Sequence, residues 1–278
     1  MINDPRPIGM FDSGLGGLTV AKEFFLGMPG ENIIYLGDTA RNPYGGRSEE
    51  TIKSFGLQDA GFLLSMDIKM LVVACNTVSS VALEAIRNKF NDIPVIGVVV
   101  PGARAAVSHT AVKRVGVIGT KATIRTHSYE KAIAMIDPEI KTYSRACPLF
   151  VPLVEEGLID NDITRMAAQH YLYDLVNYGI DCLILGCTHY PMLMESIQGV
   201  MGAGDQLLDS AFWTAKEAKD ILTAMDIRNA ATFGGMEKSR FFVTDLTDGF
   251  REISASFLGG NTPNAEKINL EQLTKYTI

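Results

Sequence analysis

The sequence lacks the features that mark several large classes of protein. It has no Lys/Arg cluster longer than a pair, and its 32 acidic and 25 basic residues give a formal net charge of −7. This charge argues against a polyanionic nucleic acid as the main partner, because nucleic-acid-binding domains carry basic patches. A composition that is 47% hydrophobic and 21% charged also excludes a disordered, collagenous or coiled-coil chain. The chain is typical of a globular protein, and a small molecule is the expected partner.

Cysteine is scarce, and long uninterrupted apolar runs are missing. The four cysteines include no CxxC pair, and two of them end apolar runs, which indicates a reducing compartment. The longest apolar stretch, residues 95–107, is broken by Pro101, Gly102 and Arg104. The N-terminal segment has neither the basic start nor the apolar run of a secretory signal. We therefore expect a cytoplasmic protein without membrane spans.

Short apolar runs rich in β-branched residues alternate with longer segments of helical period. This alternation predicts an α/β protein with parallel sheets that helices cover on both faces. Helices are expected over residues 48–66, where Ser48 starts a capping pattern, and over residues 163–178. The predicted strands span residues 8–11, 33–36, 70–74, 95–99, 115–119, 182–186, 206–209 and 240–243.

Two connections, residues 39–47 and residues 148–161, are predicted to be extended loops. Long loops in α/β proteins often carry binding residues, so both are candidate parts of a site. No linker rich in Pro, Gly or Ser divides the chain. Residues 259–264 are expected to begin a mobile tail.

One internal similarity indicates two related halves. MLVVACNT at residues 70–77 and CLILGCTH at residues 182–189 share a buried strand that ends in a cysteine, followed by small polar residues. Ligands bind at the carboxyl ends of the strands in such sheets. The pattern therefore predicts two α/β halves, each of which offers a thiol, Cys75 or Cys187, at the ligand-binding end.

A cysteine between a strand and a helix lies near free backbone N–H groups and the positive end of the helix macrodipole, which favour a thiolate. Only a few per cent of a free thiol is ionised at neutral pH, so this environment suits a catalytic base or nucleophile. The alternative is a buried structural cysteine. The paired context favours a functional role for Cys75 and Cys187, whereas Cys147 and Cys182 lack it and are expected to be structural.

Acidic and imidazole groups accompany the two thiols. Residues 12–17 follow the first strand and open a helix, but their spacing is not GxGxxG and no GK[ST] follows, which argues against a nucleotide site. Asp12 suits an ammonium group or a proton relay beside a thiol. His189 lies two residues beyond Cys187 and suits proton transfer. The absence of HxxxH and CxxC spacing argues against zinc, and no metal is expected.

Six motifs in concert resemble the glutamate racemases of the aspartate/glutamate racemase superfamily. The similarity runs from about residue 7 to residue 245, in the order and spacing of that family. The motifs are DSGLGGLTV at residues 12–20, GDTARNPYG at 37–45, ACNT at 74–77, GVIGTKATI at 116–124, VPLVEEG at 151–157 and GCTHYP at 186–191.

The resemblance implies two pseudo-symmetric α/β domains that face each other across the active site. The first would comprise residues 1–97 plus 210–278, and the second residues 98–209. The implied activity is cofactor-independent interconversion of L-glutamate and D-glutamate, which supplies D-glutamate for peptidoglycan synthesis. A homodimer is also implied, and neither a membrane nor a nucleic acid is an expected partner.

The resemblance also assigns roles to residues. It makes Cys75 and Cys187 the catalytic thiols, with Asp12 and His189 as proton-transfer assistants. The positions that it implies for substrate binding are Asp12, Ser13, Pro43, Tyr44, Gly45, Asn76, Thr77, Thr120, Glu155, Thr188 and His189.

Inverting an α-carbon requires removing its hydrogen from one face and returning one to the other, so two opposed bases are needed.

Three other functions are weighed against this one. The same chemistry could act on aspartate or a hydantoin, because a few pocket contacts decide the side chain. A two-lobed amino-acid-binding protein would keep the cleft without needing thiols. A cysteine hydrolase would leave the second cysteine unexplained.

Overall fold

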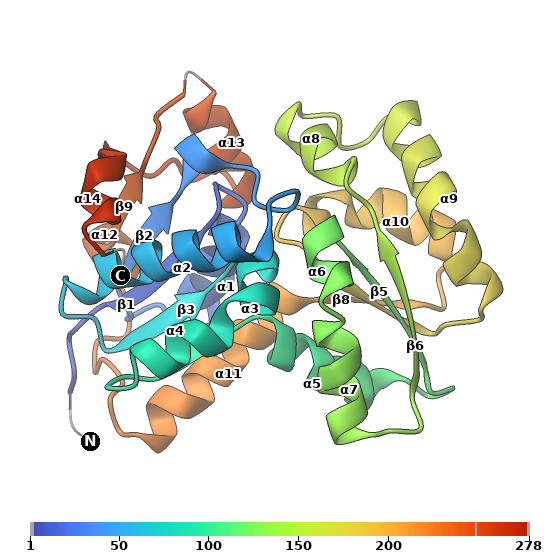
Figure 1. Ribbon diagram of the computed structural model, residues 1–278, viewed down its shortest axis with the longest axis horizontal. Helices are drawn as coiled ribbons and strands as arrows, with labels where there is room; N and C mark the ends of the chain where they lie inside the picture. The colour runs from blue at the N-terminus through green and yellow to red at the C-terminus, as the bar shows by residue number, and fades with distance from the viewer. Residues whose placement is uncertain (1–2, 248, 277–278) are drawn as a thin grey trace.

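Two parallel β-sheets, with helices on their faces, make up the computed structural model, which describes residues 3–247 and 249–276 (Figure 1). Every strand pairing within these residues is parallel. The predicted α/β class is confirmed. The strands are β1 (Ile8–Asp12), β2 (Ile33–Gly37), β3 (Met70–Val73), β4 (Val95–Gly97), β5 (Arg114–Gly119), β6 (Lys141–Ala146), β7 (Cys182–Gly186), β8 (Gln206–Asp209), β9 (Arg240–Val243) and β10 (Ala265–Lys267).

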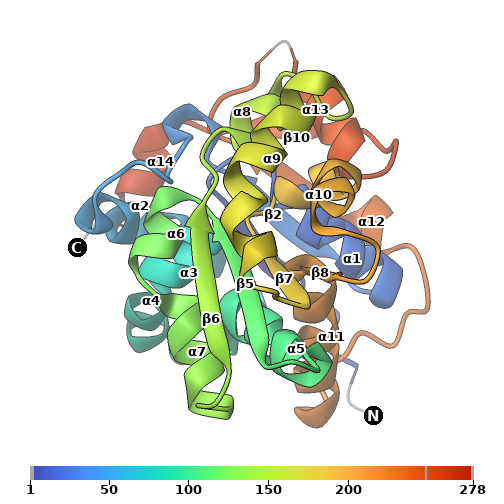
Figure 2. The same ribbon diagram turned by 90° about the vertical axis from the view of Figure 1, so that its right-hand side faces the viewer.

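The two sheets repeat one strand order. The first sheet reads β10-β9-β2-β1-β3-β4 and the second reads β6-β5-β7-β8. The run β2-β1-β3-β4 therefore matches β6-β5-β7-β8 when each number is increased by four. Figure 2 shows the strands of the second sheet side by side in this order. The predicted pseudo-symmetry of the two halves is thus visible in their topology.

Helices of widely different length connect the strands. α2 begins where the capping pattern predicts, because the Ser48 hydroxyl accepts a hydrogen bond from the Thr51 N–H at 3.2 Å. The helices are α1 (Leu18–Gly27), α2 (Glu49–Leu64), α3 (Asn76–Val81), α4 (Leu83–Lys89), α5 (Val99–His109), α6 (Lys121–Arg125), α7 (Ser128–Ile136), α8 (Phe150–Glu155), α9 (Asp162–Asn177), α10 (Met194–Met201), α11 (Ser210–Ala224), α12 (Gly235–Lys238), α13 (Phe250–Phe257) and α14 (Leu270–Thr274), with 3₁₀ turns η1 (Thr39–Arg41) and η2 (Tyr190–Leu193).

Both faces of each sheet are buried, as the continuous apolar runs predict. In β1, Met10 packs into a core with Phe24 of α1, whereas its neighbour Phe11 packs into another core with Ile52 of α2. Successive side chains of a strand point to opposite faces, so one apolar run supplies two cores. In the second sheet, Leu183 and Ile184 of β7 divide between two cores in the same way.

Each sheet takes its strands from one of the two predicted domains. The strands of the first sheet lie within residues 1–97 and 210–278, and those of the second lie within residues 98–209. α11 packs against both α1 and α5, so it joins the two halves at the bottom of Figure 1. The division into these two domains stays a prediction.

The sequence misplaced several elements. The predicted strand over residues 95–99 ends at Gly97, because Val98 caps α5 and Val99 begins it. The predicted loop over residues 148–161 contains α8. Residues 259–264 do not begin a mobile tail, since the chain continues into β10 and α14, where Leu273 is buried. β6 and β10 were missed because they are edge strands with polar, partly exposed side chains.

No helix within the described residues is long and apolar enough to cross a membrane.

Candidate active site

The carboxyl ends of equivalent strands supply the candidate site. β3 leads through Ala74 to Cys75, which caps α3, and β7 leads directly to Cys187. β1 ends at Asp12, and its counterpart β5 ends one residue before Thr120, which caps α6. Because the strands are parallel, their carboxyl ends lie at one edge of each sheet, and these polar side chains lie at that edge.

These strand ends and two loops surround one small cavity between the two halves of the chain. Its volume is about 30 Å³. The cavity is lined by Ser13, Asn42, Pro43, Tyr44, Gly45, Cys75, Asn76, Thr77, Thr120, Val151, Cys187, Thr188 and His189.

The structure brings nearly all the predicted site residues together. Asp12 and Glu155 do not line the cavity but lie behind it, in contact with residues that do. Two lining residues, Asn42 and Val151, were not singled out from the sequence. Each stands inside a motif that was quoted, so its proximity to Pro43 or to the VPLVEEG run could have identified it.

Cys75 is buried and has a polar neighbour. Its Sγ lies 3.6 Å from the hydroxyl oxygen of Ser13, within hydrogen-bonding reach for sulfur. Burial and the charge of Asp12 together raise the pKa of the Cys75 thiol to about 12, against hydrogen bonds from Val78 and Ser13 that lower it. Cys75 therefore rests as the neutral thiol in this arrangement.

Asp12 is a buried acidic neighbour of Cys75. One carboxyl oxygen, Oδ1, accepts a hydrogen bond from the Gly14 N–H at 3.0 Å, and the other has no hydrogen-bond partner within the described residues. Burial raises the pKa of Asp12, while the charge of His189 and the Gly17 N–H oppose that shift. A carboxyl group with a free oxygen and an elevated pKa can exchange a proton with a neighbouring thiol.

In the second half of the chain, Cys187 lies beside His189. The Cys187 Sγ is 3.9 Å from the His189 Nδ1, and the His189 Nε2 is 3.3 Å from the Glu155 Oε1. Burial lowers the pKa of His189, but the contacts with Cys187 and Glu155 outweigh it and raise the pKa to about 10. His189 is therefore a cation at neutral pH, and a cation at this distance stabilises negative charge on the Cys187 sulfur.

Glu155 also links the two halves. Its Oε1 accepts a hydrogen bond from the Asn42 amide at 3.2 Å in addition to the contact with His189. Burial raises the pKa of Glu155, yet the hydrogen bond and charge of His189 dominate and leave the pKa lowered. Asn42 thus joins the loop of one half to the acidic group of the other.

Hydrogen bonds between polar side chains also connect the walls of the cavity near the ends of β3 and β5. The Thr77 and Thr120 hydroxyls lie 2.9 Å apart across the halves. The Tyr129 hydroxyl donates to the Asn76 Oδ1 at 2.6 Å, which fixes the orientation of that amide. The Asn76 Nδ2 is buried without a partner in the described part of the chain. A donor in this state can serve a carboxylate.

A buried charge network holds the loop that carries Pro43, Tyr44 and Gly45. The Tyr44 hydroxyl donates to carboxylate oxygens of Asp38 and Asp59, the latter at 3.2 Å. Arg41 pairs with both carboxylates, with its Nη2 2.9 Å from the Asp59 Oδ1. Burial and the charge of Asp38 raise the pKa of Asp59 well above its usual range. One cation therefore balances two acids, of which Asp59 holds its proton more readily.

The segment after β1 contacts the opposite half closely at Gly16. A Cβ atom at this position would overlap the Thr188 hydroxyl oxygen and lie 2.6 Å from the His189 Cε1. Only glycine leaves room for this approach. Gly16 therefore allows the backbone of the first half to pack closely against His189.

The remaining cysteines lie outside the cavity. Cys147 is buried, with its Sγ 3.7 Å from the Arg145 carbonyl oxygen, and Cys182 begins β7 inside a core. All four cysteines are free thiols. The described residues contain no group of three or more His, Cys, Asp or Glu side chains arranged to hold a metal ion.

Comparison with known proteins agrees with this geometry. The family model of the Asp/Glu/hydantoin racemases matches residues 28–218. A glutamate racemase from Geobacter metallireducens is 47% identical over 266 residues, which cover 96% of this chain and 97% of the relative.

Solved structures also match along nearly the whole chain. A glutamate racemase from Francisella tularensis in complex with D-glutamate superimposes with a TM-score of 0.90 at 38% identity, covering 96% of this chain and 99% of the relative. One from Bacillus anthracis gives a TM-score of 0.91 at 40% identity, with 95% and 98% covered. The chain therefore belongs to the Asp/Glu/hydantoin racemase family.

Proposed function

We propose that this protein is a glutamate racemase that inverts the α-carbon with Cys75 and Cys187 as opposed bases. One observation carries the proposal: two thiols at equivalent strand ends of the two halves line the same cavity. A binding protein needs no thiol there, and a cysteine hydrolase needs only one. Glutamate is the proposed substrate because relatives that match over nearly the full length are named glutamate racemases, one of them bound to D-glutamate.

The neighbours of the two thiols support different starting states. Cys187 beside the cationic His189 begins as the thiolate and removes the α-hydrogen of one isomer. Cys75 begins as the thiol and returns a hydrogen to the opposite face. The reaction leaves Cys187 as the thiol and Cys75 as the thiolate, which is the state required for the reverse direction. Asp12 and His189 exchange protons with the thiols between turnovers.

The carboxylate group of the substrate next to the reacting carbon needs fixed hydrogen-bond donors. We assign the substrate carboxylate to the N–H groups and side chains at the starts of the two turns, around Asn76, Thr77 and Thr188. These donors stabilise the negative charge that develops when the α-hydrogen leaves. Ser13, Pro43, Tyr44, Gly45 and Thr120 complete the wall of the cavity, with Glu155 behind it.

The resemblance to the glutamate racemases extends the proposal to a cellular role and an oligomeric state. The product D-glutamate would supply peptidoglycan synthesis, and the protein would act in the cytoplasm as a homodimer. The arrangement of thiols and acid–base side chains supplies both proton transfers, so no cofactor is assigned to the reaction.

A circular-dichroism time course tests the proposal. Purified protein, without added cofactor, is mixed separately with L-glutamate, D-glutamate, L-aspartate and D-aspartate. The signal of both glutamate isomers should decay to zero, and the aspartate signals should persist. Decay of the aspartate signals alone would show that aspartate, and not glutamate, is the substrate. Constant signals throughout would refute racemase activity.

A further inference from the structure

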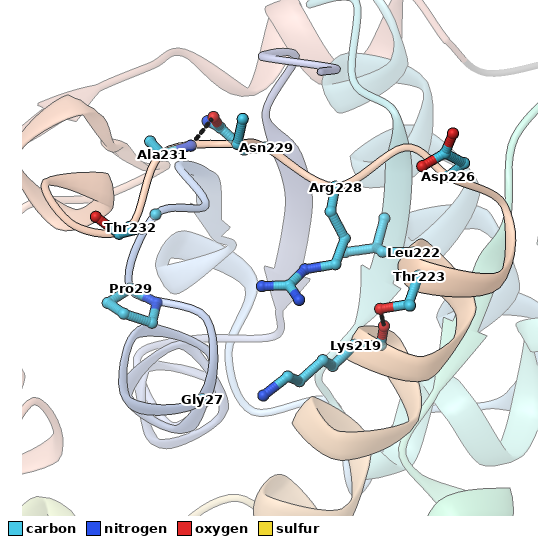
Figure 3. Close-up of a pocket in the computed structure, with 12 residues that line it drawn as sticks. Gly27, Pro29, Lys219, Leu222, Thr223, Asp226, Arg228, Asn229, Ala231 and Thr232 are labelled. Carbon is cyan, nitrogen blue, oxygen red and sulfur yellow. Dashed lines mark hydrogen bonds between the residues drawn. The ribbon is translucent and has the colours of Figure 1, made fainter. Parts of the chain in front are cut away.

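A second cavity shares no lining residue with the site that contains the cysteines. It lies at the carboxyl ends of α1 and α11, closed on one side by the segment 226–232 (Figure 3). Its volume is about 640 Å³. Pockets that hold small organic ligands typically measure about 300–1,000 Å³. This cavity is therefore large enough for such a ligand, and the proposed racemase chemistry does not use it.

Two cationic side chains enter this cavity from different elements. Lys219 extends from α11 and Arg228 from the segment 226–232, and both point into the space beside Pro29 (Figure 3). Neither side chain forms an ion pair within residues 3–247 and 249–276. The Arg228 Nε is also buried there without a hydrogen-bond acceptor. A buried charged donor that lacks an acceptor is costly, so an anion would stabilise it.

The acid at the edge of the cavity does not fill this role. Asp226 belongs to the lining, but its carboxylate points away from the two cations in Figure 3. The nearby Glu31 is buried and committed elsewhere: its Oε2 pairs with Lys69 at 2.6 Å and its Oε1 accepts from the Asn229 N–H at 2.8 Å. The positive charge of the cavity therefore remains available to a ligand.

Hydrogen bonds of the backbone hold the segment 226–232, which carries Arg228, in place. The Arg228 carbonyl accepts a hydrogen bond from the Asp4 N–H at 3.3 Å, and the Ala231 N–H donates to the Asn229 side chain at 3.0 Å. Together with the bond from Asn229 to Glu31, these contacts fix the segment before a ligand arrives. A preformed wall lowers the ordering cost of binding.

We propose that this cavity binds a small organic molecule through a phosphoryl group, held by Arg228 and Lys219. A phosphate monoester carries close to two negative charges at neutral pH, which matches the two cations. The guanidinium fork can contact two phosphoryl oxygens at once, and the lysine acts as a point charge. Pro29, which is exposed, offers apolar surface to the rest of the molecule.

Titration of the whole protein with phenyl phosphate, followed by calorimetry, tests the site. Inorganic phosphate and benzoate serve as the comparison ligands, because the first lacks the apolar body and the second has a single negative charge. We expect phenyl phosphate to bind more tightly than either. Arg228→Gln and Lys219→Gln should each weaken its binding by roughly tenfold or more, since each removes a charge-assisted contact. Equal affinity of phenyl phosphate and benzoate would contradict recognition of the phosphoryl group.

Lys216→Gln provides the matched control. Lys216 stands on the same helix, where its ammonium lies 5.0 Å from the centre of the Trp213 ring and outside this cavity. Its loss should leave the affinity for phenyl phosphate within about twofold of wild type. An equal loss of affinity in Lys216→Gln would show only nonspecific attraction, and the absence of binding by wild type would overturn the proposal. Lys219 is exposed, so Lys219→Gln tests the site even if Arg228→Gln impairs folding.

Glutamate turnover separates this site from the proposed active site. Neither Arg228 nor Lys219 lines the cavity of the cysteines, so kcat/KM for glutamate without phenyl phosphate should match wild type in both variants. Loss of phosphate binding with unchanged kcat/KM supports a separate site. A parallel loss of turnover would contradict its independence. Because binding is measured directly, failure of the racemase proposal would leave this result unaffected.

Discussion

Cys75 and Cys187 follow equivalent strands, β3 and β7, of two sheets with the same strand order, and both line one cavity. The surroundings of the two thiols are nevertheless different. Cys75 has Ser13 and the acidic Asp12 beside it, whereas Cys187 has the cationic His189. The repeated fold thus brings two thiols to one cavity, and the side chains near the ends of β1 and β7 give each thiol a different charge environment.

Removal of either thiol tests the two-base assignment. Cys75→Ala and Cys187→Ala should each lower glutamate racemisation by at least about three orders of magnitude, because the return or removal of a proton on one face loses its group. The fold should survive, since each side chain borders a cavity. Cys182→Ala is the matched control, because its thiol lies in a core at the start of β7 and should affect stability alone. Substantial racemisation by Cys75→Ala or Cys187→Ala, measured by circular dichroism, would refute the assignment.

The contact between His189 and Glu155 predicts a shift in the pH profile. Contacts with Cys187 and Glu155 raise the pKa of His189 to about 10, so the imidazolium persists at neutral pH and is lost as the pH rises through that value. Glu155→Gln removes one of the two groups that raise the pKa. The alkaline limb of kcat/KM should therefore move to lower pH.

The neighbouring exposed acid supplies the control for this experiment. Glu156→Gln removes the same charge one residue away, outside the lining of the cavity, and should leave the alkaline limb in place. A shift of the limb to higher pH in Glu155→Gln, or the same shift in both variants, would contradict the role given to the His189–Glu155 contact. Profiles of kcat/KM from pH 6 to pH 11 cover the expected range, which includes the ordinary histidine pKa of about 6.5.

The close approach at Gly16 gives a prediction about positioning. Gly16→Ala places a Cβ 2.6 Å from the His189 Cε1, so the imidazole or the whole first half must move. We expect kcat/KM for glutamate to fall roughly tenfold or more, because proton transfer depends steeply on geometry. Gly46→Ala is the control, since a Cβ there meets no atom within 4 Å. Equal activity of the two variants would show that His189 tolerates displacement.

Much of this architecture was predictable because apolar runs in parallel sheets are continuous and short. Strands such as β7 begin and end where the apolar run does. Two of the edge strands, β6 and β10, broke the rule: β6 reads KTYSRA, whose side chains are polar and partly exposed. The helix α8 was missed within a segment predicted to be a loop, because Pro152 and a short length hide its periodicity.

The candidate site was predictable where chemistry and strand ends coincide. Cys75, Cys187 and His189 stand at or just after the ends of apolar runs, and their types are rare enough to attract attention. Asn42 and Val151 have common side chains in loop or helix segments, so their chemistry did not single them out although both stand inside quoted motifs. The contact of Glu155 with His189 likewise joins residues 34 positions apart, a pairing that no local pattern encodes.

The charge network behind Tyr44 predicts a large effect on stability. Arg41 forms ion pairs with both Asp38 and Asp59, whose side chains are fully buried. Arg41→Gln would leave two buried acids without a compensating charge and should lower the free energy of unfolding by about 3–5 kcal/mol at neutral pH. Arg47→Gln, an exposed substitution in the same loop, should change it by less than about 0.5 kcal/mol. Urea denaturation of both variants measures the difference, and similar values would contradict the importance of the network.

The two-base mechanism itself is tested by running the reaction in heavy water and stopping it at low conversion. The thiol that donates to the far face has exchanged with solvent, while the abstracting thiol holds the hydrogen of the substrate. Inversion should therefore introduce solvent deuterium, and the product should be labelled first. Return of the abstracted hydrogen to its own face regenerates unlabelled starting isomer, so the remaining substrate should stay nearly free of deuterium.

A single mobile base predicts a different distribution of label. It would carry the abstracted hydrogen to the other face, leaving the product unlabelled, or exchange it with solvent first, labelling substrate and product together. Mass spectrometry of the separated isomers, starting from L-glutamate and then from D-glutamate, distinguishes these outcomes. Labelled product with unlabelled substrate in both directions requires a separate donor on each face, the roles proposed for Cys75 and Cys187, which line one cavity from the two halves. Early deuterium in recovered substrate at the level of the product would remove that assignment.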